Sequence, residues 1–100
     1  MAEETKVKLI EAEEVRQRIN DLDKKAGEMA EYIRIDERRK ALASLEDQQA
    51  SGDFWNDQNK AKDIIARTNA ERAYVQPFDQ LVKTVEDAAV MLELAEAEDD

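Results

Sequence analysis

Sharp turns are rare in this sequence, because only two glycines and one proline occur among its 100 residues. Ala, Glu, Leu, Lys, Arg and Gln dominate, and these residues lose little entropy in a helix. Five aromatic residues are too few for a sandwich or barrel, because such folds depend on β-branched and aromatic strands. The sequence therefore predicts an all-α fold: an antiparallel helical bundle of three helices with coiled-coil character, in one domain spanning 1–100.

The first helix is expected from about Thr5 to Ile33, with Thr5 as its N-cap. Gly27 interrupts it and marks either a bend or a close approach by a neighbouring helix. Apolar residues recur at spacings of three and four and form one stripe: Val15, Ile19, Leu22, Ala26, Met29 and Ile33.

The second helix is expected over 36–50, capped by Ile35-Asp36. Gly52 follows it and is expected to end it in the left-handed conformation, because glycine has no Cβ to clash there. Its inner face is expected to consist of Ile35, Leu42, Leu45 and Gln49.

The third helix is expected over 57–97, capped by Asn56 or Asp57, although Pro77 lies inside this stretch. The apolar phase favours one long helix kinked at Pro77, because a loop would reset the phase. The alternative is a break at Gln76, with Pro77 as the first residue of a new helix. One register of threes and fours continues through the proline: Ala61, Ile64, Thr68, Val75, Phe78, Val82, Val85, Ala89 and Leu92.

The net charge of −10 argues against nucleic acid as a direct partner, because phosphate binding needs a basic face. The basic clusters are Lys24-Lys25, Arg38-Arg39-Lys40 and the pair Lys60/Lys62, and acidic residues flank each of them. They are interpreted as solvated helix faces with local ion pairs. The alternative is a local patch for a partner, for which Arg38, Arg39 and Lys40 are the candidate contact residues.

The sequence offers no candidate catalytic, cofactor-binding or metal-binding residues. Cysteine and histidine are absent, so thiolate pairs, histidine triads and the usual transition-metal sites cannot form. No Gly-rich phosphate loop occurs. The chain is therefore expected not to be an enzyme and to need no cofactor. No apolar segment is long enough to span a membrane, so a cytoplasmic location is expected.

Phe54-Trp55-Asn56-Asp57 contains the one tryptophan and forms a junction between the second and third helices. One interpretation is a hydrophobic staple, in which an aromatic folds over the first turn onto Ala61 or Ile64 and Trp55 is buried. The other is an exposed aromatic anchor, because Trp and Phe are enriched at the centres of protein interfaces.

This junction resembles the N-terminal region of the bacterial release factor 2 family, where a similar aromatic-Trp-Asn element opens a long helix. The segments 38–42 and 45–46 before it, and Val85-Glu86-Asp87 after it, are similar to the family too, as are 92–95 and Asp99-Asp100. Tyr32 and Asp36 also lie where the family has a tyrosine and an acidic residue. The resemblance covers about residues 15–100.

The resemblance implies the helical first domain of a translation-termination factor that reads UGA and UAA and promotes peptide release on the ribosome. It implies contacts with the ribosomal stalk base and with the other domains of the same factor. The family's Ser-Pro-Phe and Gly-Gly-Gln loops, which read the codon and release the peptide, do not occur in this chain. The chain is therefore expected to be truncated at its C-terminal end.

Two other interpretations stay open: a free-standing helical adaptor, and a fragment of a ribosome-rescue factor. A homodimer of the fragment is also expected, because the short second helix cannot cover the apolar seam of the third. That seam contains Phe78, Leu81, Val85, Ala88, Leu92 and Ala95.

Overall fold

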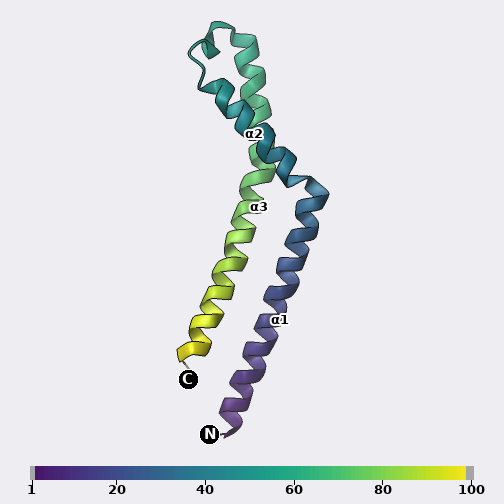
Figure 1. The fold of residues 1–100 in the computed structure, drawn as a ribbon, viewed down its shortest axis with the longest axis vertical. Helices are drawn as coiled ribbons and strands as arrows, with labels where there is room; N and C mark the ends of the chain where they lie inside the picture. Colours follow the sequence, from purple (N-terminus) through teal and green to yellow (C-terminus); the bar gives the residue numbers. More distant parts are fainter. Residues whose placement is uncertain (1, 99–100) are drawn as a thin grey trace. The chain divides into compact units, whose positions relative to one another are not determined.

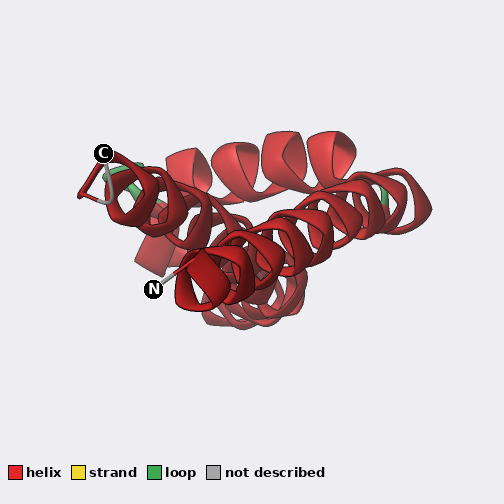
Figure 2. Cartoon of the chain, turned by 90° about the horizontal axis from the view of Figure 1, so that it is seen from below, coloured by secondary structure: helices red, strands yellow, loops and turns green. Residues whose placement is uncertain are grey.

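The computed structural model describes residues 2–98, with the side chains of Lys6 and residues 9–98. Three α-helices and one 3-10 turn make up the described chain, and no strand occurs in it (Figures 1 and 2). The predicted all-α fold of three helices is confirmed. The elements are α1 (Ala2–Ile33), α2 (Ile35–Gln49), η1 (Phe54–Asn56) and α3 (Gln58–Glu98).

Two capping predictions for the first two helices are wrong. Thr5 lies inside α1 rather than before it, because the helix already begins at Ala2. The residue before α2 is Arg34 in the left-handed conformation (φ 56°, ψ 55°), and Asp36 lies in the first turn without capping the helix through its side chain. A left-handed residue between two right-handed helices changes the direction of the chain, so Arg34 marks the bend between α1 and α2.

The end of α2 and the middle of α1 also differ from expectation. Gly52 does not have a positive φ, so the left-handed stop predicted there is wrong. Ala50 ends α2 in the right-handed conformation, with its N–H bonded to carbonyls of the last turn. A Cβ added at Gly27 would meet no described atom within 4 Å, which rules out the close helix approach considered for that residue.

The third helix is continuous from Gln58 to Glu98 with Pro77 inside it, so the alternative of a break at Gln76 is wrong. Its buried and half-buried side chains follow spacings of three and four along the whole helix. This heptad face accounts for the continuity, since burial on both sides of Pro77 outweighs the one backbone hydrogen bond that proline removes. The face contains Ala61, Ile64, Thr68, Glu71, Val75, Phe78, Val82, Val85, Ala89 and Leu92.

The described chain divides into two compact units, and the last part of α3 belongs to unit 1 with most of α1. Unit 1 comprises residues 1–28 and 80–100, and in it the two helices run antiparallel (Figure 1). Arg16 of α1 forms an ion pair with Glu96 of α3, while Ala26 and Val85 are buried. Within unit 1 the seam of α3 is therefore partly covered by α1, and a homodimer stays a prediction.

Unit 2 comprises residues 29–79 and contains α2, η1 and the first part of α3. A small core of Phe54, Ala61 and Ile64 lies where α2 and α3 meet the turn between them, with Leu45 and Ile65 packed against it. Thr68 is 1% exposed, and its hydroxyl donates to the carbonyl of Ile64 at 2.7 Å and accepts from the Gln49 amide at 2.6 Å. The buried hydroxyl of Thr68 thus has a partner both as a donor and as an acceptor.

Candidate functional site

Arg38, the first of the three candidate contact residues, lies at the start of α2 and holds three helices together within unit 2. Its Nε donates to the carbonyl of Ile33 at the end of α1, at 2.7 Å. Its guanidinium donates to Glu71 of α3 at 3.4 Å and lies over the ring of Tyr74, 3.6 Å from the ring centre. Arginine suits this position because its planar group can donate in two directions while stacking on an aromatic face.

Arg39 also makes contacts within unit 2, although it is exposed, as Lys40 is. Both terminal nitrogens of Arg39 donate to the carboxylate of Asp79, one of them at 3.1 Å, and the hydrogen bonds to Asp79 raise the pKa of Arg39. The guanidinium carbon lies 6.0 Å from the centre of the Phe78 ring. Two of the three candidate residues therefore have intramolecular partners, and contact between these residues and another molecule stays a prediction.

Replacing Arg38 with lysine is expected to lower the free energy of unfolding by about 1–2 kcal/mol. A lysine keeps the positive charge, but its single ammonium group cannot bond to the Ile33 carbonyl and to Glu71 while also lying over the Tyr74 ring. Urea unfolding followed by circular dichroism measures the change. The matched control is Arg67→Lys, because Arg67 is exposed and makes an i,i+4 pair with Asp63, so it should change stability by less than about 0.5 kcal/mol. Equal effects of the two variants would contradict the three-way role of Arg38.

The junction between α2 and α3 reverses the expected roles of its two aromatics. Phe54 is buried on Ala61 and Ile64, while Trp55 is 69% exposed. The two rings meet edge to face, with centres 4.8 Å apart. Phe54 is therefore the staple, and of the two interpretations the one in which Trp55 is buried is wrong. The physical reason is the tight η1 turn, which points neighbouring side chains in different directions.

Asp57 is the residue that caps α3. Its Oδ1 accepts the backbone N–H of Lys60 at 3.1 Å, and its carbonyl accepts the N–H of Ala61 at 2.9 Å. A side-chain bond to the third amide of the helix is the usual N-cap geometry. Of the two residues proposed as cap, Asp57 thus occupies the position and Asn56 ends the η1 turn.

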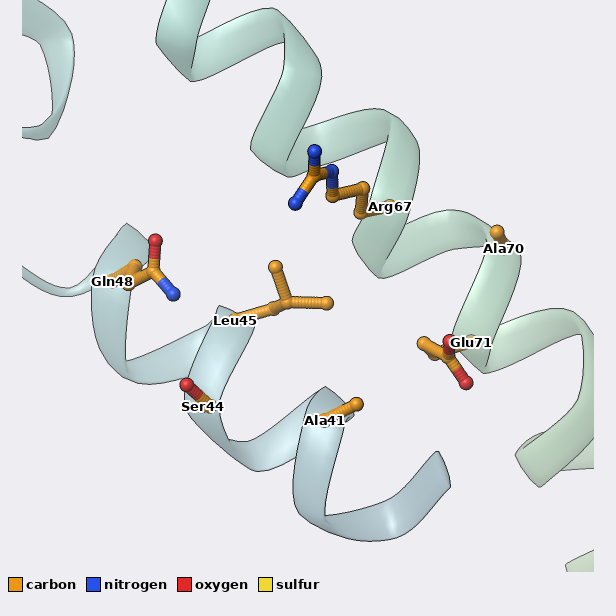
Figure 3. A pocket seen from close by; sticks show the side chains of 7 residues that line it. All are labelled: Ala41, Ser44, Leu45, Gln48, Arg67, Ala70 and Glu71. Atoms are coloured by element: carbon orange, nitrogen blue, oxygen red, sulfur yellow. The ribbon is translucent and has the colours of Figure 1, made fainter. Parts of the chain in front are cut away.

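Unit 2 also has two shallow, open clefts between α2 and α3. In the first, of about 350 Å³, Leu45 points from α2 into the space between the helices and Arg67 reaches toward it from α3 (Figure 3). The second, of about 310 Å³, lies at the junction and has Phe54 and Ile64 as its apolar residues. Among the described residues no group of carboxylates could hold a metal ion. Both clefts therefore suit contact with a side chain better than catalysis.

The sequence pattern did not reveal the partners of the arginines. Glu71 and Asp79 lie 33 and 40 residues from Arg38 and Arg39, and their acidic side chains look like any others on the surface of a charged helix. One feature of the sequence does indicate that Glu71 has a partner. Glu71 occupies an inner position of the α3 heptad, where an apolar residue is usual. A charged group there needs a partner on the facing helix.

Several bacterial proteins are similar to nearly the whole chain, and they share one description. Identity is 32% over 84 residues with peptide chain release factor 2 of Exiguobacterium sp., covering 81% of this chain and 23% of that protein. It is 32% over 82 residues with that of Acidothermus cellulolyticus, covering 82% of this chain and 22% of that protein. It is 28% over 91 residues with that of Staphylococcus epidermidis, covering 91% of this chain and 24% of that protein. The chain resembles release factor 2.

The resemblance to release factor 2 expected from the junction and its flanking segments is confirmed. The chain spans about a quarter of the length of these relatives. No family model and no solved structure matches it. Among the described residues, no helix is both long and apolar enough to cross a membrane.

Proposed function

We propose that the chain is the N-terminal helical domain of a peptide chain release factor and that it serves translation termination in the cytoplasm. The observation that carries the proposal is the similarity over 82–91 residues to proteins described as peptide chain release factor 2. The all-α fold and the aromatic junction at the start of a long helix fit the domain. The proposal treats 1–100 as one functional domain.

The domain contributes position and protein contact rather than chemistry. A full-length factor would read UGA and UAA through a Ser-Pro-Phe loop and promote peptide release through a Gly-Gly-Gln loop, and neither sequence occurs here. The chain has no histidine or cysteine that could act as nucleophile or base. On this proposal the isolated chain is not an enzyme, although the whole factor takes part in a hydrolysis.

The charge distribution supports a protein contact at the ribosomal stalk base over direct contact with RNA. Unit 1 has 15 acidic and seven basic residues, a net charge of −8, while unit 2 has ten acidic and eight basic residues, a net charge of −2. Contact with phosphate would require the opposite balance. Lys40 is the proposed contact of unit 2, because it is exposed, whereas the charges of Arg38 and Arg39 pair with Glu71 and Asp79.

A chimera tests this function. The 84 matching residues of the Exiguobacterium release factor 2 are replaced by this chain, and peptide release is measured on ribosomes stalled at UGA, UAA or UAG. The chimera should release peptide at UGA and UAA at a rate close to that of the parent factor, and not at UAG. The control replaces the same segment with an unrelated helical hairpin of similar length. A folded chimera that releases no better than this control would overturn the proposal.

The alternative of a free-standing adaptor has one observation in its favour, the exposed apolar side chains of unit 1. These are Leu9, Ile10, Val15, Leu22, Val90, Met91 and Leu94. Self-association through them stays a prediction, which sedimentation at micromolar concentration checks. Like charges on two copies of unit 1 would oppose such a dimer, so a higher salt concentration should strengthen it.

A further inference from the structure

Trp55 is a large apolar side chain held at the surface by its neighbour. It is 69% exposed, yet its ring lies edge to face on Phe54, which is buried in the small core of unit 2. The adjacent Asp57 fixes the start of α3 by capping it. An exposed indole on such an ordered turn costs little entropy to immobilise when it meets a partner. Exposed tryptophans of this kind are typical of interface centres.

A cleft lies at this turn and is lined by Phe54 and Asn56, the two sequence neighbours of Trp55, and it suits a long side chain with a charged end. It has a volume of about 310 Å³, with buried Phe54 and Ile64 as its apolar residues. Its polar lining consists of Gln48, Ser51, Asp53, Asn56, Asp57 and Lys60. An apolar base with carboxylates beside it matches arginine or lysine, whose aliphatic stems pack on apolar surface while their charged ends stay at the rim.

The charge around this turn is acidic. Between residues 41 and 60 there are four acidic residues and one basic residue, Lys60, which also lines the cleft. The hydroxyl of Ser51 donates to Asp53 and holds the pKa of that carboxyl below its ordinary value, so Asp53 stays charged in mildly acidic solution. Asp53 and Asp57 lie two residues before and two residues after Trp55, and both line the cleft, so they are the candidate carboxylates for a cation bound at this turn.

We propose that the turn formed by residues 48–60 is a docking site for an arginine-bearing segment of another protein. The guanidinium lies against the indole of Trp55 and pairs with Asp53 or Asp57, and the aliphatic stem fills the cleft over Phe54 and Ile64. Arginine fits better than lysine because its planar group stacks on an indole and binds a carboxylate with two nitrogens.

Two other occupants fit the site less well. A single-stranded nucleic acid could stack a base on Trp55, but its phosphates would face a turn in which four acidic residues outnumber the one basic residue, Lys60, between 41 and 60. A second copy of the chain has a net charge of −10, and two members of its basic triplet, Arg38 and Arg39, already pair with Glu71 and Asp79. A basic protein segment is therefore the occupant that the charges favour.

The test is a titration of the whole chain with a blocked Gly-Arg-Gly-Arg-Gly peptide, followed by NMR. Trp55 is the single tryptophan, so one indole N–H resonance reports on the site. The peptide should shift that resonance and the amides of residues 48–60 in a saturable way. The corresponding lysine peptide should bind more weakly, and the glutamine peptide should not bind. Absence of saturable binding by the arginine peptide would overturn the proposal.

Variants distinguish binding of the peptide at this turn from nonspecific attraction of a basic peptide to an acidic chain. Trp55→Ala should weaken peptide binding by about tenfold, and Asp53→Asn should weaken it several-fold. The control for the aromatic is Tyr32→Ala, because Tyr32 is 89% exposed in the same unit. The control for the charge is Glu93→Gln in unit 1. Circular dichroism confirms that the variants are folded, and the Asp53 variant keeps the test informative if the Trp55 variant is not.

Each other outcome counts against the proposal. Equal weakening by the site variants and their controls would mean that the peptide binds the net charge alone. A larger shift of the indole by a uridine oligonucleotide would make the turn a nucleic-acid site. A shift that depends on protein concentration without peptide would make it a contact between copies. Because this titration uses neither ribosomes nor a full-length factor, it can fail or succeed independently of the proposed role in termination.

Discussion

Replacing Phe54 with alanine is expected to lower the free energy of unfolding by about 3–5 kcal/mol, the usual cost of truncating a buried aromatic. The phenyl ring is 8% exposed and forms the small core of unit 2 with Ala61 and Ile64. Truncation leaves a cavity that these two short side chains cannot fill. Urea unfolding followed by far-UV circular dichroism measures the loss.

The neighbouring aromatic gives the matched control for this prediction. Trp55→Ala removes a larger ring from the same turn, but that ring is 69% exposed. It should cost no more than about 1.5 kcal/mol, the value of its edge-to-face contact with Phe54. A larger loss for Trp55 than for Phe54 would mean that the tryptophan, rather than the phenylalanine, is the staple of α3.

Replacing Pro77 with alanine is expected to raise the free energy of unfolding by about 2–3 kcal/mol. Proline inside α3 cannot donate to the carbonyl of Ala73, one turn earlier, and its ring crowds that turn. Alanine restores the hydrogen bond. Because Pro77 is exposed, little burial is lost with its ring. The loss of proline's restraint on the unfolded chain subtracts up to about 1 kcal/mol from the gain.

The same unfolding experiment tests this gain against Gln76→Ala. Gln76 is the exposed neighbour with an intact backbone N–H, so its replacement should change stability by less than about 0.5 kcal/mol. An unchanged or lower stability for the Pro77 variant would show that unit 2 and unit 1 depend on the local geometry that proline imposes.

Helices were predictable here because their signals repeat. The apolar residues of α3 continue in one register through Pro77, and this periodicity correctly outweighed the proline as a local signal. A cap at Asp57 was also predictable as one of two candidates, because its side chain bonds to a backbone amide only three residues away. The left-handed conformation of Arg34 was not predictable, because glycine usually occupies such a position and this chain has an arginine there.

The candidate site was less predictable because it depends on where side chains point. Composition alone cannot tell which of two adjacent aromatics is buried, and the turn at η1 buried Phe54 and exposed Trp55. The pairing of Arg38 with Glu71 joins residues 33 positions apart, beyond the reach of helix periodicity. Coverage of the α3 seam by α1 required knowing that the last part of α3 packs in one unit with most of α1.

The unbroken register of α3 restricts how the length of this helix can change during evolution. One inserted residue turns everything beyond it by about 100°, so an insertion near Pro77 would carry Val85 from the buried face toward solvent. An insertion of seven residues restores the face almost completely, because seven residues make nearly two turns. Homologous chains with a longer or shorter α3 should therefore differ in steps of seven residues.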